Sequence, residues 1–495
     1  MQTEGSSAPA SLEVGQVVDG FRLDALAHRG GMASLWNVSR VGSDASSDVA
    51  LPLLMKVPRL RGGEDPTAIV GFEVEQMIMP TLAGPHVPRY IAHGDFTRLP
   101  YIVMERIEGR SLRERFDAAP LPIDEVALLG AKVATALHDL HRQRVVHLDV
   151  KPSNIMLRRC PDGSDGEAVL IDFGLSRHDL LPDLLEEEFE LPMGTSPYMS
   201  PEQVRFVRND PRSDLFSTGV MLYHLTTGKR PFGMPSSVRG LRRRLYREPT
   251  APRTLRADCP PWLQEVILHC LEVRPERRYQ TAGQLAFDLQ HPDQIVLGER
   301  AGRAGSGSAA DVIKRWFVSL RDSDPVEGGA GGQSARSPIV LAAIDVDGAD
   351  PALLESARTA ALRLIEAERG ARLACLTVMR VNRVGMDELL EDDGTPRHLK
   401  LLVALRHWAR PLQQALSSPG SADRDAATRV TFHVIEAVDP ATAIVDYARR
   451  NQIDHIVMGA RGSGRLRRHL GSVSARVVAE SDCTVTVVRA PSSAG

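Results

Sequence analysis

The chain has 495 residues, too many for one hydrophobic core, which predicts two or three domains. Its 60 Lys and Arg residues against 63 Asp and Glu give a net charge of -3, which excludes a global attraction to nucleic acid. The 5 cysteines are odd in number and lack metal-ligand spacing, so we expect a reducing compartment rather than secretion. No segment is long and apolar enough to cross a bilayer and no signal pattern opens the chain, which predicts a soluble, cytoplasmic protein.

Residues 1–18 are polar and are expected to be disordered, whereas residues 20–60 alternate as short strands. The alternation is broken by the stretch Arg29–Ser34, which contains Gly30 and Gly31. Glycines let backbone amides come close to a phosphate group. On its own this stretch predicts only a loop.

One lysine, Lys56, interrupts the buried-strand pattern Leu53–Val57. Burying an unpaired ammonium group is costly, so we expect an acidic partner, the alternative being a lysine at an exposed strand end. The helical run at residues 72–79 offers Glu75 as that partner and Glu73 as the competing choice. The sequence therefore predicts an ion pair between a strand and a helix.

Residues 101–109 predict a strand that runs into a turn, and Ile123–Arg142 has the apolar spacing of an amphipathic helix. The strongest chemical signal follows, in His147–Asn154 together with Asp172–Gly174. Asn154 and Asp172 can supply oxygen atoms to metal ions that bridge phosphates. Within the first motif, a carboxylate two residues before a lysine can accept the proton of a substrate hydroxyl while the lysine neutralises phosphate charge.

This ordered pair of motifs resembles the catalytic loop and metal-binding motif of eukaryotic-like (Hanks-type) bacterial serine/threonine protein kinases. The resemblance implies an α+β two-lobed protein kinase fold over residues 19–295, with a small lobe at 19–104 and a large lobe at 105–295. It also implies ATP and Mg2+ as cofactors and protein Ser and Thr hydroxyls as substrates, with autophosphorylation as a further expectation. No nucleic-acid partner is expected.

The same resemblance assigns roles to individual residues. The implied catalytic residues are Asp149, Lys151, Lys56 and Glu75. The implied nucleotide-binding residues of this domain are Gly30, Gly31, Leu35, Lys56, Met104, Glu105, Ile107 and Met156. The implied metal ligands are Asn154 and Asp172.

Two predicted contacts hold together the part of the fold around this site. By the resemblance, Asp214 binds the backbone of the catalytic loop, and Glu202 forms a buried ion pair with Arg278. Both roles are structural. Their presence predicts that the kinase fold is complete to about residue 290.

The position before the catalytic Asp departs from the family pattern. Most kinases have an Arg there that binds a phosphate on the activation loop, whereas this chain has Leu148. Between Ser176 and Thr195 the loop offers no Ser, Thr or Tyr, but it carries Glu186–Glu188 and Glu190. We therefore expect activation without loop phosphorylation. For the acidic run, a solvated face is the favoured interpretation and a mimic of phosphate the alternative.

Residues 296–337 shift to Gly, Ala, Ser and Arg and predict a flexible linker. Inside it, residues 311–321 place Val312, Trp316 and Leu320 on one helical face between basic residues. A helix that packs on either domain is the favoured interpretation. A peripheral membrane helix or a partner-binding helix is the alternative, since one short apolar face gives only marginal membrane affinity.

Residues 338–490 alternate between strand-like and helix-like segments, which predicts an α/β doubly wound parallel sheet (Rossmann-like) whose ligands bind at the carboxyl ends of the strands. The predicted strands are residues 339–345, 372–381, 430–435, 455–458 and 484–488. The predicted helices are residues 351–368, 398–415, 440–451 and 473–480.

A glycine-rich stretch, residues 458–464, follows one of these strands and precedes the Gly-Ser that opens a helix. Amides and the helix dipole at such a site favour an anion. Together with Asp345 at the end of the first strand, this pattern resembles the universal stress protein family. The resemblance implies adenine nucleotide binding, and a homodimer formed through this domain is a further expectation. The implied nucleotide-binding residues are Asp345, Gly459, Gly462, Gly471 and Ser472.

Taken together, the sequence predicts a serine/threonine protein kinase fused to a C-terminal universal stress protein domain that senses nucleotide or stress. The alternative is a pseudokinase scaffold that binds nucleotide and partner proteins without turnover, which His28, Ala33 and Leu54 would favour because they replace residues usual in the family. A further alternative is that the stress domain is the main actor and the kinase its dedicated modifier.

Overall fold

The computed structural model describes residues 12–41, 51–59, 66–96, 98–189, 192–305, 338–367, 371–381, 396–416, 430–451, 453–460 and 471–490. The predicted linker helix at residues 311–321 lies outside these ranges, as do Glu190 and Gly462. Among the helices within them, none is long and apolar enough to cross a membrane.

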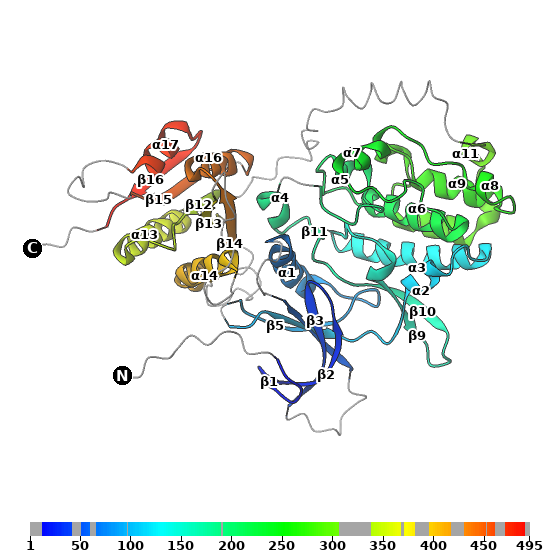
Figure 1. Ribbon diagram of the computed structural model, residues 1–495, viewed down its shortest axis with the longest axis horizontal. Helices are drawn as coiled ribbons and strands as arrows, with labels where there is room; N and C mark the ends of the chain where they lie inside the picture. Colours follow the sequence, from blue (N-terminus) through cyan, green and yellow to red (C-terminus); the bar gives the residue numbers. More distant parts are fainter. Residues whose placement is uncertain are drawn as a thin grey trace, which may run out of the picture.

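The small lobe is a six-stranded antiparallel sheet in the order β1-β2-β3-β4-β6-β5, followed along the chain from β4 by helix α1 (Pro66–Ile78) (Figure 1). Its strands are β1 Val17–Val18, β2 Phe21–Arg29, β3 Ala33–Arg40, β4 Leu53–Pro58, β5 Tyr90–Gly94 and β6 Tyr101–Glu105. Gln76 of α1 donates hydrogen bonds to the carbonyls of Gly94 and Tyr101, which ties the helix to β5 and β6. Residues 1–18 were expected to be disordered, but strand β1 falls at the end of that stretch. Its pairing with β2 orders it.

The large lobe is mainly helical, as the two-lobed kinase fold requires. Its helices are α2 Leu112–Asp117, α3 Ile123–Arg142, α4 Leu184–Glu188, α5 Pro201–Val204, α6 Arg212–Thr227, α7 Val238–Leu241, α8 Pro252–Leu255, α9 Pro261–Cys270, α10 Ala282–Gln290 and α11 Glu299–Gly302. Its short strands are β7 Gly109–Ser111, β8 Val145–Val146, β9 Ile155–Arg159, β10 Asp165–Leu170 and β11 Arg177–His178. Helix α3 has the predicted bounds, and it buries an apolar stripe that includes Val126, Leu129, Val133, Leu137 and Leu140.

Helix α11 extends the large lobe beyond the predicted boundary at residue 295. Ala301 is buried, and Gln264 of α9 donates hydrogen bonds to the carbonyls of Arg300, Ala301 and Arg303. Gly305 then accepts a hydrogen bond from the backbone of Ala251. The prediction ended the lobe too early because residues 296–305 have the same Gly, Ala and Arg composition as the linker that follows.

The C-terminal domain is a five-stranded parallel sheet in the order β14-β13-β12-β15-β16, which confirms the predicted α/β fold. Its strands are β12 Ile339–Ala343, β13 Arg372–Arg380, β14 Val430–Ala437, β15 His455–Gly459 and β16 Thr484–Val488. Its helices are α13 Pro351–Ala367, α14 Arg397–Leu416, α16 Pro440–Arg450 and α17 Ser472–Glu480. Helices α13 and α14 pair on one face of the sheet and α16 and α17 on the other (Figure 1).

The two halves of the molecule meet at helix α4. This short helix packs against α1 of the small lobe and against β14, an edge strand of the C-terminal sheet (Figure 1). An edge strand can pair with a strand of another chain, and packing by α4 protects part of β14 from such pairing.

Candidate active site

Lys56 on strand β4 pairs with Glu75 on helix α1. Its Nζ atom lies 2.6 Å from Glu75 Oε2 and 3.0 Å from Asp172 Oδ1. Glu73, the competing partner, binds Arg406 of the C-terminal domain instead. Although burial opposes the charge, Asp172 and Glu75 raise the pKa of Lys56, and Lys56 in turn lowers the pKa of Asp172. The ammonium group therefore stays charged between two carboxylates.

The carboxylate of Asp149 is held from two segments of the chain. Lys151 Nζ lies 2.5 Å from Asp149 Oδ2, and Asn154 Nδ2 donates to the same oxygen over 3.0 Å. Thr195 donates to Asp149 Oδ1 from its hydroxyl over 2.6 Å and from its backbone amide over 3.0 Å. Lys151 also donates to Thr195 Oγ1 over 3.0 Å. These contacts fix the orientation of the carboxylate before any substrate binds.

Sequence reasoning missed the contact that Thr195 makes. Thr195 directly follows Gly194, whose φ of 130° is a backbone conformation that favours glycine. A hydroxyl residue directly after a glycine in this loop is a local signal that could have pointed to it. Its link to Lys151 and Asp149 makes it part of the site.

Asn154 lies beside the strand end that leads into Asp172, because the amide of Ile171 donates to the carbonyl of Asn154 over 2.9 Å. Asn154 uses its amide nitrogen on Asp149, which turns its side-chain oxygen away from that carboxylate. Within the described residues, no group of three or more His, Cys, Asp or Glu forms a metal cage. One amide oxygen and one carboxylate fit Mg2+, which keeps several waters and takes further oxygens from substrate phosphates.

The loop that carries Asp149 is held by Asp214 from helix α6, as predicted. Asp214 accepts hydrogen bonds from the backbone amides of His147 and Leu148, both over 2.9 Å, and lies 2.8 Å from His141 Nε2. Leu148 has a φ of 62°, a conformation that costs a non-glycine residue about 1–2 kcal/mol. The buried carboxylate and a hydrogen bond from Gln203 to the carbonyl of Leu148 hold it there.

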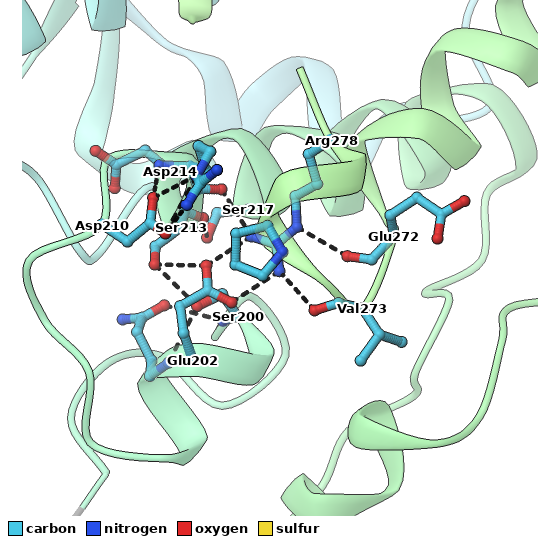
Figure 2. A network of polar contacts seen from close by, with 12 residues as sticks. Ser200, Glu202, Asp210, Ser213, Asp214, Ser217, Glu272, Val273 and Arg278 are labelled. Carbon is cyan, nitrogen blue, oxygen red and sulfur yellow. Dashed lines mark hydrogen bonds and ion pairs between the residues drawn. The ribbon is translucent and has the colours of Figure 1, made fainter. Parts of the chain in front are cut away.

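The predicted pair of Glu202 and Arg278 lies at the centre of the network in Figure 2. Arg278 Nη1 and Nη2 lie 2.6 and 2.7 Å from the two carboxylate oxygens of Glu202. The arginine side chain is 0% exposed, and its guanidinium lies 5.0 Å from the ring of Phe216. Ser213 adds a hydrogen bond to Glu202 over 2.7 Å. This network joins helix α5 to the segment between α9 and α10.

The glycine-containing stretch forms a tight hairpin between β2 and β3. Gly30 donates its amide to the carbonyl of Ala33 over 3.0 Å, and Arg59 donates to the carbonyl of Gly30 over 3.0 Å. Gly31 follows at the tip, and Leu35 on β3 is the register partner of Lys56 on β4. The hairpin thus lies on the strand next to the active-site lysine.

The predicted adenine-contacting residues come from the end of β6 and from β9. Met104 is buried on β6, and the side chain of Glu105 pairs with Arg158 of β9 at 2.5 Å. Ile107 follows between β6 and β7, and Met156 lies on β9. The Glu105 ion pair was not predicted, and it links the two lobes at the point where they join.

The activation loop, residues 176–195, is anchored by contacts inside the large lobe. Asp183 caps helix α4 by accepting from the amide of Glu186, and Arg208 Nε donates to Asp183 Oδ2 over 2.8 Å. Both side chains are 8% exposed. Ser176 is buried and donates to the carbonyl of His147. No sequence motif links Asp183 with Arg208, which lie 25 positions apart along the chain.

The C-terminal domain contains a cavity of about 450 Å³ at the carboxyl ends of its strands. Asp345, Gly459, Gly471 and Ser472 all line it, so four of the residues predicted to bind nucleotide share one site. Gly471 is the N-cap of helix α17. The amides at this helix end face a site suited to an anion.

These features define a protein kinase domain followed by an α/β domain with a parallel sheet. Comparison with known families gives the same division: residues 63–290 match the protein kinase domain model, and residues 338–489 match the universal stress protein family model. The chain carries a protein kinase domain followed by a domain of the universal stress protein family.

Curated relatives include several bacterial kinases. A probable serine/threonine-protein kinase PknB of Corynebacterium glutamicum is 32% identical over 283 residues, which cover 55% of this chain and 42% of the relative. The serine/threonine-protein kinase PknL of Mycobacterium tuberculosis is 33% identical over 250 residues, which cover 50% of this chain and 61% of the relative. The chain thus spans about half the length of these relatives. A crystal structure of the Mycobacterium tuberculosis PknI kinase domain is 22% identical, with a TM-score of 0.43 and coverage of 57% of this chain and 99% of that chain.

Proposed function

We propose that this protein transfers the γ-phosphoryl group of Mg-ATP to Ser and Thr hydroxyls of proteins. The observation that supports the proposal most strongly is the pairing of Lys56 with Glu75 while Asp172 lies on its other side. A charged lysine next to a carboxylate of metal-ligand type matches what phosphoryl transfer needs: positioning of the phosphates and stabilisation of their charge.

Each residue then has a chemical task. Lys56, oriented by Glu75, binds the α- and β-phosphates. Asp149 accepts the proton of the substrate hydroxyl, and its fixed orientation means that little reorganisation is needed during the reaction. Lys151 lies 2.5 Å from Asp149 and can neutralise charge on the transferred group.

ATP and Mg2+ are the proposed cofactors. When bound, Mg2+ would neutralise negative charge on the phosphate groups. Asn154 and Asp172 would hold it through side-chain oxygens. The hairpin of Gly30 and Gly31 would cover the phosphates, and the other nucleotide contacts are proposed at Leu35, Met104, Glu105, Ile107 and Met156.

For the C-terminal domain we propose an adenine nucleotide in the 450 Å³ cavity. Its phosphates would meet the amides at Gly471 and Ser472, where the dipole of α17 favours negative charge. Asp345 would face the ribose or the adenine, and Gly459 and Gly462 would complete the loop around the phosphates.

The decisive experiment incubates the purified full chain with labelled ATP and casein as acceptor. Asp149→Asn should lower the rate at least about 100-fold, equivalent to about 2.7 kcal/mol of transition-state stabilisation. Asp162→Asn, a change at an exposed loop carboxylate, is the matched control and should keep the wild-type rate. Wild-type phosphorylation by Asp149→Asn would contradict the proposal.

A further inference from the structure

The end of helix α4 is bound by the universal stress domain. His433 on β14 lies between Glu187 and Glu188, with Nε2 3.1 Å from Glu187 Oε2 and Nδ1 3.2 Å from Glu188 Oε1. The histidine side chain is 0% exposed. Arg372 Nη2 and the hydroxyl of Tyr447 also reach Glu187, at 3.4 and 3.3 Å. The acidic run of the activation segment is therefore an interdomain contact, and the favoured sequence interpretation of a solvated face is wrong for these two residues.

A second contact joins the stress domain to helix α1. Arg406 on α14 forms an ion pair with Glu73, which is only 5% exposed. Its guanidinium lies 4.8 Å from the rings of both Phe96 of the kinase domain and Phe432 of the stress domain. A guanidinium between two aromatic faces and a buried carboxylate is a strong anchor, because it combines cation–π and ionic contacts.

The two anchors act on the elements that form the active site. Residues two apart on a helix point in different directions, so Glu73 faces the stress domain while Glu75 faces Lys56. Helix α4 is held at its start by Asp183 and Arg208 inside the kinase domain and at its end by the other domain.

In the structure the stress domain is in contact with the kinase domain while the active-site contacts are formed. Lys56 is 2.6 Å from Glu75 and Asp149 is bound by Thr195, so the contacts required for catalysis coexist with the interdomain contacts. Leu148 provides no charge for a phosphorylated loop to bind. The stress domain supplies the charged partner for the activation segment instead.

We propose that the universal stress domain is an intramolecular activator of the kinase: by binding Glu187 and Glu188 of α4 and Glu73 of α1, it holds both helices where Lys56 and Glu75 are paired. His433 and Arg406 are positioning residues in this account. The inference rests on the proposed kinase function and assigns its regulation to a surface within the same chain.

A double-mutant cycle in the full chain tests it, with Glu73→Gln, Arg406→Gln and the combination of both. Each single variant should lower kcat/KM for ATP about tenfold, and the double variant should be no slower than the slower single variant, because the two residues act through one contact. Arg449→Gln, at an exposed arginine of the same domain that pairs with Asp482, is the matched control and should keep the wild-type rate. Circular dichroism checks that each variant is folded. Unchanged or faster phosphorylation by Arg406→Gln would overturn the proposal.

Failure of the kinase proposal can be told apart from failure of this one. Hydrogen exchange at the amides of α4 reports docking without any turnover. If the wild type does not phosphorylate casein, the proposed function fails. Faster exchange at α4 in His433→Ala than in the wild type would still support the domain contact, whereas equal exchange would overturn it.

Discussion

Two buried ion-pair clusters hold this molecule together, one inside the kinase domain and one between the domains. The internal cluster pairs Glu202 with Arg278 through two short hydrogen bonds of 2.6 and 2.7 Å. The interdomain cluster pairs His433 with Glu187 and Glu188 over longer distances, 3.1 and 3.2 Å. The side chains of Arg278 and His433 are both 0% exposed. The first cluster lies within one domain, whereas the second joins two domains.

The difference between the clusters is one of consequence. Breaking the internal pair leaves a charge inside a single folding unit, so the cost falls on the stability of the whole lobe. Breaking the interdomain pair exposes its charges to water as the domains separate, so each domain can remain folded. An arginine is also charged at any physiological pH, whereas a histidine titrates. The first cluster therefore fixes architecture, and the second can act as a switch.

The largest effect is expected at the internal cluster. Arg278→Gln should lower the free energy of unfolding of the kinase domain by about 3–5 kcal/mol, because it leaves Glu202 buried without its partner. Urea unfolding of the full chain, followed by hydrogen exchange at helix α6 of the kinase domain, measures this loss. The matched control is Arg22→Gln, whose ion pair with Asp24 is exposed and should contribute at most about 1 kcal/mol. A loss below about 1 kcal/mol in Arg278→Gln would contradict the structural role.

The next largest effect is expected at the pair of Lys56 and Glu75. Loss of this pair should slow the reaction and leave the fold intact. Lys56→Met should lower phosphorylation of casein at least about 100-fold, or about 2.7 kcal/mol in the barrier, with an unfolding midpoint close to that of the wild type. Lys229→Met, at an exposed position, is the control. Phosphorylation at the wild-type rate in Lys56→Met would contradict the role assigned to the lysine.

The interdomain cluster should respond to pH. His433 is faced by Glu187 and Glu188 of α4 and by Tyr447 of α16, and Arg372 of β13 reaches the same Glu187. Burial opposes the charge of the histidine, but its hydrogen bonds to the two glutamates raise the pKa of His433 to about 9. Burial also raises the pKa of Glu188 to about 7. Both shifts mean that the docked state binds protons more tightly than the separated state.

The direction of the pH effect follows. The contribution of His433 to docking is complete below its ordinary pKa of about 6.5 and is lost as the pH rises through about 9. Hydrogen exchange at α4, corrected for the intrinsic rate, should therefore increase at least about tenfold between pH 7 and pH 9.5, and exchange at α6 should not. His433→Ala should already exchange fast at pH 7 and lose the pH dependence. Equal pH dependence in α4 and α6 of the wild type would contradict the assignment.

The smallest effect is expected from removal of phosphate. Because Asp183 and His433 already anchor the activation segment, a phosphatase-treated sample should start phosphorylating casein without a lag. Ser176→Ala should change the rate little, since this hydroxyl is buried and donates to the carbonyl of His147. A phosphate that mass spectrometry finds on Thr195 or Ser196 and that is required for activity would contradict this prediction.

Much of the fold could be predicted because its signals are local. The apolar spacing of Ile123–Arg142 gave the bounds of α3, and the alternation of strands and helices gave the parallel sheet of the C-terminal domain. The resemblance to protein kinases implied Glu75 rather than Glu73 as the partner, and the structure pairs Glu75 with Lys56. Motifs of this kind carry information because each residue has a fixed role within one domain.

The contacts that could not be predicted are those between distant segments with no shared motif. Arg406 and Glu73 are 333 positions apart, and nothing in the spacing of either residue indicates the other. The Glu187 and Glu188 side chains looked like a solvated face because an acidic run is usually exposed, and only their contact with His433 of β14 shows that they face the other domain. Helix α11 was missed because its residues have the composition of a linker.

Hydrogen exchange at the amides of helix α1 in the full chain tests the central claim most directly, because it reports whether the stress domain holds the helix that carries Glu75. The wild type, the inactive Asp149→Asn variant and the Arg449→Gln control should show the same slow exchange, since none of these changes touches the interdomain contacts. Arg406→Gln should exchange at least about tenfold faster at α1, with phosphorylation reduced in parallel. Equal exchange at α1 in Arg406→Gln and in the wild type would show that the stress domain does not hold this helix, and the account would be wrong.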